Sequence, residues 1–187
     1  MLERIFVAIN LSAAVKQQVF ELQQYLNRKQ LPVNWTVAEN LHLTVIFLGD
    51  LSRWEIDKLG GLVDDITRLS GPFELEFNRL GFFPGMKKSS ALFLRPRRNQ
   101  NLNRIHHRLR LVCREHSLAK VCGKPFLPHL TIGKFRASAG IKKFRPVIKR
   151  SKVKLRLPVK SIDIMKSNLA TKPVTYTCIH RSFLAES

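Results

Sequence analysis

Residues 41–48 read Leu-His-Leu-Thr-Val-Ile-Phe-Leu, and residues 129–132 read His-Leu-Thr-Ile. In each stretch a histidine and a threonine stand two positions apart, with leucine between them and a β-branched residue after them. Both stretches predict a β-strand. Because side chains alternate along a strand, His42 and Thr44 share one face, and the leucine between them faces a core. Each strand is therefore expected to present one imidazole and one hydroxyl on the same side.

The two motifs belong to longer segments that match at an offset of 87 residues, the interval between the two histidines. Apolar, β-rich runs at 4–9 and 91–94 predict a strand ahead of each motif. Apolar residues at three- and four-residue steps predict a helix after each of these strands, over 15–26 and 102–112. Each half is thus expected to run strand, helix, loop, strand. A pseudo-twofold axis between the halves would make the two His–Thr pairs face each other across a cleft.

The remaining segments predict an α+β chain of mostly antiparallel strands with helices on the outer faces. A helix is expected over 56–69, and composition makes 81–85 a loop. Further strands are expected over 73–77, 153–157, 162–165 and 175–179. With 187 residues and 44% hydrophobic content, residues 1–187 are expected to form one domain made of two pseudo-symmetric lobes.

The net charge of +20 is concentrated in the second part of the chain. Residues 1–80 hold 8 Lys/Arg and 10 Asp/Glu, whereas residues 81–187 hold 25 and 3. This excess predicts attraction to a polyanion; RNA, DNA and an acidic membrane surface all fit, and the plain alternative is a solvated basic face. The stretch 142–160 has nine Lys/Arg and no acid. If the polyanion is RNA, this stretch is expected to follow its backbone, together with Lys87, Lys88, Arg95, Arg97 and Arg98.

Cysteine usage and hydropathy indicate the compartment. The three cysteines include no Cys-x-x-Cys pair, which disfavours a disulfide framework and a zinc site and fits a cytoplasmic protein with reduced thiols. Neither a signal peptide nor an apolar run of membrane-spanning length is evident, so no membrane partner is expected. The chain also lacks a Walker-type glycine loop and clustered carboxylates. Neither a metal nor another cofactor is expected, and the protein is expected to be a monomer.

Two imidazoles facing each other suit the cleavage of a phosphodiester without a metal ion. A neutral histidine takes a proton from the attacking water, and a protonated histidine gives a proton to the departing sugar oxygen. The hydroxyls of Thr44 and Thr131 are expected to donate to the non-bridging phosphate oxygens, where negative charge builds up. A single His-x-Thr strand would more often be structural, but the matched pair makes His42 and His129 candidates for the acid and the base.

The other four histidines are not assigned to catalysis. His106 and His107 are expected on a solvated helix face beside arginines, and His116 near the end of that helix. His180 is expected near the end of a strand and has no partner in the repeat.

The segments that carry the two motifs resemble those of a known family. Residues 40–49 and 126–132 are similar to the paired HxTx motifs of the 2H phosphoesterases, and most similar to those of the bacterial and archaeal RNA 2′,3′-cyclic phosphodiesterases, formerly called 2′-5′ RNA ligases. Weaker likenesses extend over most of the chain, at residues 4–9, Trp35, residues 81–84 and the strand at Tyr176. The resemblance implies a bilobal fold around a central cleft. It also implies metal-free hydrolysis of a terminal 2′,3′-cyclic phosphate to a 2′-phosphate.

The resemblance also implies a role for each site residue. His129 would activate water, and His42 would protonate the leaving 3′ oxygen. The side chains of Thr44 and Thr131 would hold phosphate oxygens, and Phe47 would lie beside the nucleoside.

One position departs from the family pattern. Lys134 stands where the family usually has arginine, which keeps the positive charge but loses the bidentate fork. Arg136, two residues further along the strand, shares its face and is expected to compensate. Phe83, with Phe47, is expected to offer a surface on which bases stack.

The sequence is also compatible with other functions. The chain could be an RNA-binding protein with an inactive fold, or a 2′-5′ RNA ligase that runs the reverse reaction at the same site. It could also act on small cyclic nucleotides or on by-products of tRNA splicing. The expected partner is RNA, either tRNA-like or an oligonucleotide with a 2′,3′-cyclic phosphate end.

Overall fold

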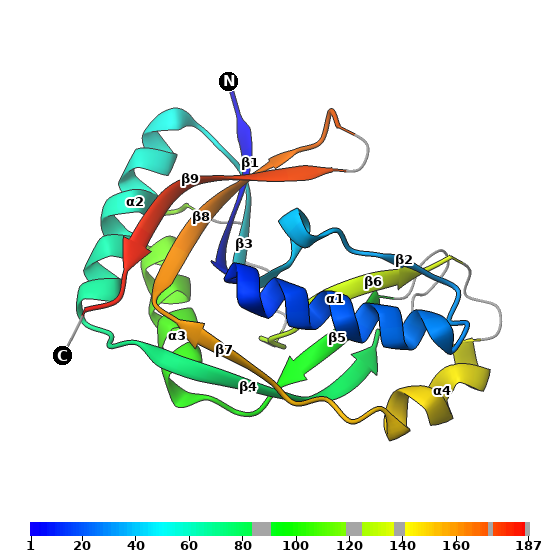
Figure 1. Ribbon diagram of the computed structural model, residues 1–187. Helices are drawn as coiled ribbons and strands as arrows, with labels where there is room; N and C mark the ends of the chain where they lie inside the picture. Colours follow the sequence, from blue (N-terminus) through cyan, green and yellow to red (C-terminus); the bar gives the residue numbers. More distant parts are fainter. Residues whose placement is uncertain (84–90, 119–124, 137–140, 172–173, 186–187) are drawn as a thin grey trace.

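Strands that carry the two His–Thr motifs lie next to each other at the centre of a curled antiparallel sheet (Figure 1). The computed structural model describes residues 1–187 apart from 84–90, 119–124, 137–140, 172–173 and 186–187, and only the backbone of 141–143. Its strands are β1 (Glu3–Asn10), β2 (Val33–Trp35), β3 (His42–Leu51), β4 (Phe73–Phe82), β5 (Ala91–Pro96), β6 (Leu130–Phe135), β7 (Leu155–Val159), β8 (Ser161–Asn168) and β9 (Thr175–Phe183). Its helices are α1 (Ala13–Arg28), α2 (Arg53–Arg68), α3 (Gln100–Glu115), α4 (Ile141–Arg150) and the short 3-10 helix η1 (Ala38–Asn40).

The duplication expected from the sequence is confirmed by the order of the strands. They run β7-β4-β5-β6-β3-β1-β8-β9, with β2 paired to β6. The 87-residue offset maps α1 onto α3 end to end, and it places β1 on β5 and β3 on β6. Each lobe is therefore half of one sheet, and the two lobes meet where β3 adjoins β6.

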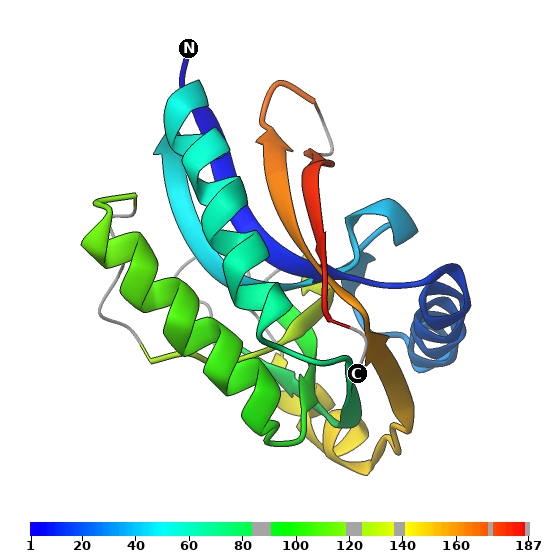
Figure 2. The same cartoon turned by 90° about the vertical axis from the view of Figure 1, so that its left-hand side faces the viewer.

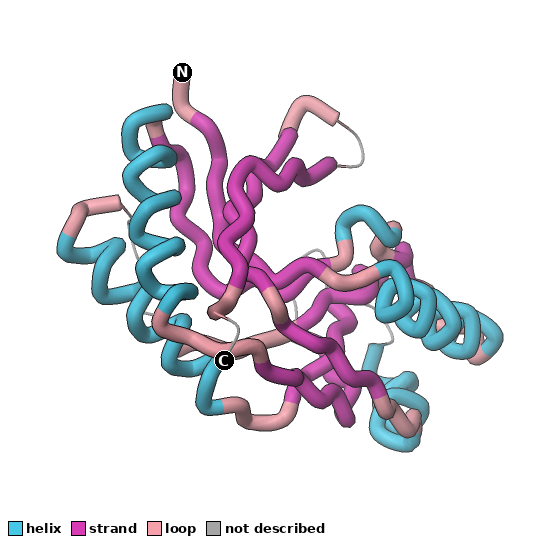
Figure 3. Tube along the Cα trace, turned by 60° about the vertical axis from the view of Figure 1, so that its left-hand side comes forward, coloured by secondary structure: helices cyan, strands magenta, loops and turns pink. Residues whose placement is uncertain are grey.

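Each lobe is covered on its outer face by helices (Figure 2). Helices α2 and α3 pack against each other and against β3, β8 and β9, whereas α1 packs on β7 and α4 on β4. Side chains cap the helices, since Ser12 and Asn99 accept from the backbone N–H groups of Val15 and Leu102. Figure 3 shows the strands as a continuous band between these two groups of helices.

The two faces of the central strands differ in what they contact. Leu43 and Leu130 are fully buried in the core beneath the helices, as the alternation of side chains predicted. The other face carries the half-buried side chains of His42, Thr44, His129 and Thr131 and is called the pocket face below. The alternation along both strands therefore exposes the two His–Thr pairs on one side of the sheet.

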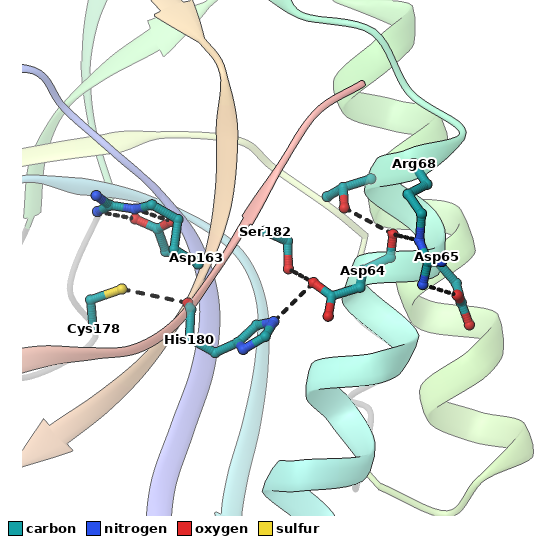
Figure 4. A network of polar contacts seen from close by, with 9 residues as sticks. Asp64, Asp65, Arg68, Asp163, Cys178, His180 and Ser182 are labelled. Atoms are coloured by element: carbon teal, nitrogen blue, oxygen red, sulfur yellow. Dashed lines mark hydrogen bonds and ion pairs between the residues drawn. The ribbon is translucent and has the colours of Figure 1, made fainter. Parts of the chain in front are cut away.

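Helix α2 is fixed to the last strand by a polar cluster (Figure 4). The carboxylate of Asp64 on α2 accepts hydrogen bonds from His180 Nε2 at 2.9 Å and from the Ser182 hydroxyl, both on β9. Both groups donate to the same carboxylate oxygen, so the serine is not paired with the imidazole as a nucleophile would be. This cluster is a structural contact, consistent with the expectation that His180 is not catalytic.

Some expectations for the local structure were wrong. Residues 81–85 were expected to form a loop, but β4 continues to Phe82, while Pro84 and Gly85 lie outside the described residues. The strand continues because the Phe82 ring packs on the core and Gly81 leaves space for the ring of Phe93. His106 is not on a solvated face, since its ring stacks on Phe126 with a centroid distance of 3.9 Å. None of the described helices is long and apolar enough to cross a membrane.

Candidate active site

A cavity of about 450 Å³ opens where β3 and β6 separate. The two strands pair at Leu43 and Leu130, but from Gly133 onward β6 pairs with β2 instead. The cavity between them holds both His–Thr pairs and Lys134. The lining residues are Asn34, Trp35, Thr36, Val37, Asn40, His42, Thr44, His129, Thr131, Lys134, Val174 and Tyr176.

Backbone carbonyls orient both imidazole rings in the same way. His42 Nδ1 lies 2.9 Å from the carbonyl oxygen of Asn40, and His129 Nδ1 lies 2.8 Å from that of Leu127. A carbonyl oxygen only accepts hydrogen bonds, so Nδ1 carries a proton in each ring. The tautomer follows from this geometry: in the neutral ring Nε2 holds the lone pair. Both Nε2 atoms are thus prepared to exchange a proton with a molecule in the cavity.

Aromatic rings hold each histidine from the side. The His42 ring lies 4.9 Å from the centroid of Phe6 and 5.0 Å from that of Tyr176. The His129 ring lies 4.9 Å from Phe83 and 5.6 Å from Phe93. These ring contacts restrict rotation of both imidazoles.

The two histidines differ in their electrostatic surroundings. Burial lowers the pKa of His42 from 6.5 to about 4, the hydrogen bond to the carbonyl of Asn40 acts in the opposite direction, and the charge of His129 adds to the lowering. At neutral pH the imidazole of His42 is therefore uncharged in the free protein. An anion in the cavity would raise this pKa, because it stabilises the charged ring.

This lowered pKa predicts a pH-dependent stability. The unfolded chain binds a proton at His42 near pH 6.5, but the folded protein does so only near pH 4. The free energy of unfolding should therefore fall by up to about 3 kcal/mol through this group as the pH drops from 6.5 to 4. Urea unfolding of the wild type and of His42→Gln at both pH values measures the effect. Equal losses in the two proteins would contradict it.

The sequence-predicted binding residues lie at different distances from the cavity. Lys134 lines it. Arg136 is exposed and donates from Nε to the side-chain oxygen of Asn34 at 3.1 Å, so it contacts a lining residue without lining the cavity itself. Phe83 packs edge-on against His129. Phe47 lies outside the lining, with the guanidinium of Arg4 5.1 Å above its ring, and its role beside a nucleoside stays a prediction.

Several lining residues were not predicted as site residues. Trp35 and Tyr176 were noted only as family likenesses, although both line the cavity. Asn40 accepts from His42 through its backbone oxygen, and its side chain donates to the carbonyl of Val174 at 2.7 Å. It therefore connects a histidine to the segment that carries Tyr176. No local pattern in the sequence reveals this contact, because the residues are far apart along the chain.

Most of the chain matches the model of one protein family. The model described as the 2′-5′ RNA ligase superfamily matches residues 38–171, a stretch that includes both His–Thr pairs. The chain belongs to the 2′-5′ RNA ligase superfamily. This confirms the resemblance drawn from residues 40–49 and 126–132.

Curated relatives within this superfamily are named RNA 2′,3′-cyclic phosphodiesterase. The protein of Thermus thermophilus is 28% identical over 95% of this chain and 88% of its own length. The protein of Methanocaldococcus jannaschii is 25% identical over 94% of this chain and 98% of its own length. These names confirm the predicted class of enzyme, a phosphoric diester hydrolase.

Solved structures confirm the fold. E. coli LigT in complex with 3′-AMP superposes with a TM-score of 0.81 at 22% identity, covering all of both chains. A second structure, that of TT0787 of Thermus thermophilus, gives a TM-score of 0.81 at 25% identity, covering 98% of this chain and 99% of its own. The chain therefore shares its bilobal α+β fold with experimentally determined structures.

Proposed function

We propose that this protein hydrolyses the 2′,3′-cyclic phosphate at the end of an RNA to a 2′-phosphate. The observation that carries the proposal is the pair of imidazoles in one cavity, each with Nδ1 bound to a backbone carbonyl and Nε2 left for chemistry. The names of the curated relatives support the substrate class. The positive charge of residues 81–187 supports a polyanionic substrate.

The reaction needs one proton removed and one proton delivered. Water attacks phosphorus while His129 Nε2 takes its proton, and the bond from phosphorus to O3′ breaks. His42 Nε2 gives a proton to O3′, which leaves a 3′ hydroxyl and a 2′-phosphate. Each positioned acid or base typically contributes about 10²–10⁴-fold to the rate. The hydroxyls of Thr44 and Thr131 and the ammonium of Lys134 stabilise the charge that develops on the non-bridging oxygens.

In this division of roles, substrate binding is coupled to protonation of His42. The ring is neutral in the free protein because burial lowers its pKa to about 4, yet a general acid must carry a proton. The anionic phosphate supplies the attraction that draws a proton onto the ring. The opposite assignment, with His42 as the base and His129 as the acid, predicts the opposite response to a leaving group that needs no proton.

An oligonucleotide that ends in a 2′,3′-cyclic phosphate tests the proposed function directly. Incubated with the wild type in EDTA, it is expected to give only the 2′-phosphate product, identified by mass spectrometry and by comparison with synthetic 2′- and 3′-phosphate standards. Intact substrate or complete inhibition by the chelator would contradict the proposed metal-free hydrolysis. Formation of the 3′-phosphate would contradict the proposed bond cleavage.

A further inference from the structure

Two arginines occupy directly opposed positions beside the cavity. Arg79 on β4 pairs across the ladder with Arg95 on β5, and the next pair on the same face is Gly81 with Phe93. A Cβ at Gly81 would meet the ring of Phe93 at 2.7 Å, and that ring lies 5.6 Å from His129. Both arginines therefore project from the pocket face, on the side of His129.

The register of the strands also places Arg79 and Arg95 close to His129. Leu94 on β5 pairs with Leu130 on β6. Because the two strands are antiparallel, Arg95, which follows Leu94, lies opposite His129, which precedes Leu130. His129, Arg95 and Arg79 thus form a row across three neighbouring strands, which are spaced about 4.8 Å apart. An extended arginine reaches across such a spacing, so both guanidiniums lie within reach of a molecule that projects from the cavity.

Neither arginine is neutralised by a described acidic residue. Both side chains are exposed, and no ion pair joins either to the described part of the chain. The acids further along β4 are engaged elsewhere: Glu76 lies 3.5 Å from Arg97, and Glu74 lies 3.5 Å from Arg156. Like charges directly opposite each other destabilise a sheet, and nothing in the described structure offsets that cost here.

The other lobe has no equivalent pair of free cations among its described residues. There Arg181 donates to both oxygens of the buried Asp163 at 2.9 Å, and Lys166 lies 2.7 Å from Glu3. In the lobe that contains β4 and β5, a second cavity of about 450 Å³ lies further along these strands. Its cationic lining residues are Arg97, Lys152, Lys154 and Arg156. Lys152 and Lys154 thus extend the positive charge of Arg79 and Arg95 across this lobe, whereas Arg97 and Arg156 are paired with Glu76 and Glu74.

We propose that Arg79 and Arg95 bind the phosphodiester that joins the terminal nucleotide to the nucleotide before it. This inference rests on the proposed function, because it takes the cavity as the site of the cyclic phosphate. Guanidinium groups form charge-assisted, bidentate hydrogen bonds with phosphate, and an anion between the two side chains would relieve their mutual repulsion. The RNA would then leave the active site over β5 and β4, passing the rings of Phe83 and Phe93.

Three substrates separate this subsite from the active site. The first is a nucleoside 2′,3′-cyclic phosphate, which has no upstream phosphate. The second is a dinucleotide with the same cyclic end and one phosphodiester, and the third is that dinucleotide with a neutral methylphosphonate linkage. The wild type is expected to have a higher kcat/KM for the charged dinucleotide than for the other two.

Arg79→Gln and Arg95→Gln are expected to lower kcat/KM for the charged dinucleotide about three- to tenfold each. Hydrolysis of the nucleoside cyclic phosphate and of the neutral dinucleotide should stay unchanged. For the charged dinucleotide, kcat/KM should depend less steeply on the salt concentration, because each variant has one cation fewer at the upstream phosphate. The matched control is Arg108→Gln, which removes the charge of an exposed arginine on α3 at the outer face.

The outcomes distinguish the two proposals. If the wild type fails to hydrolyse any of the three substrates, the proposed function fails. If it hydrolyses all three with equal kcat/KM, only the arginine subsite fails. The subsite also fails if either glutamine variant loses activity equally on all three substrates, or if Arg108→Gln has the same effect as Arg79→Gln. Thermal unfolding of each variant checks that its fold is retained.

Discussion

Replacement of His129 or of His42 by alanine is expected to lower kcat for hydrolysis of a 2′,3′-cyclic phosphate by about 10²–10⁴-fold. Each variant loses one of the two Nε2 atoms that exchange protons in the cavity. The fold should persist, because both rings lie at the cavity and are only half-buried, outside the core. Single-turnover kinetics at saturating enzyme measures this loss without interference from product release.

The double variant is expected to lose less than the product of the two single effects. Acid and base act in the same transition state, so removing either one already disables most of their joint action. His116→Ala is the matched control, since that residue is exposed at the end of α3, and it should keep the wild-type rate. A loss of less than tenfold in both single variants would remove the basis for a two-histidine mechanism.

The second large effect concerns stability, at Gly133. A Cβ at this position would lie 2.4 Å from Val33 Cγ1 and 3.1 Å from the backbone oxygen of Asn34. Both atoms belong to β2, and Val33 is buried, so Gly133→Ala must push β2 away from β6. Overpacking of this kind typically costs about 1–3 kcal/mol. Urea unfolding measures the cost.

The same substitution should also reduce activity, because β2 carries two lining residues of the cavity, Asn34 and Trp35. Gly61→Ala is the control: its Cβ would meet nothing within 4 Å, and alanine favours the helix that contains it. That variant should be as stable as the wild type or slightly more so. If Gly133→Ala were equally stable, the close packing of β2 on β6 would be wrong.

Much of this architecture was predictable from local patterns. The strands around His42 and His129 follow from alternation, and the helices α1 and α3 follow from the spacing of their apolar residues. The repeat of 87 residues then indicated two lobes and one shared cleft. These features depend on residues close together in sequence, or on a duplication that copies them.

The features that sequence reasoning missed depend on contacts between distant segments. Helix α4 contains Pro146, which argues against a helix when only local propensity is considered. Strand β2 has three residues and exists through its pairing with β6. The stack of His106 on Phe126 likewise joins α3 to the segment before His129. Neither the short strand nor the ring stack has a periodic pattern that a single sequence could show. The apolar residues of α4 at 141, 144, 147 and 148 do recur at helical spacing, but Pro146 obscures that signal.

In the proposed mechanism the two histidines divide the roles of acid and base across one phosphorus atom. A cyclic phosphate whose 3′ oxygen is replaced by sulfur tests it, because a thiolate leaves without needing a proton. Hydrolysis by His42→Ala should be restored toward the wild-type rate on this substrate, whereas His129→Ala should stay slow. Restoration of His129→Ala alone would reverse the two roles, and failure to restore either variant would contradict the acid–base pair.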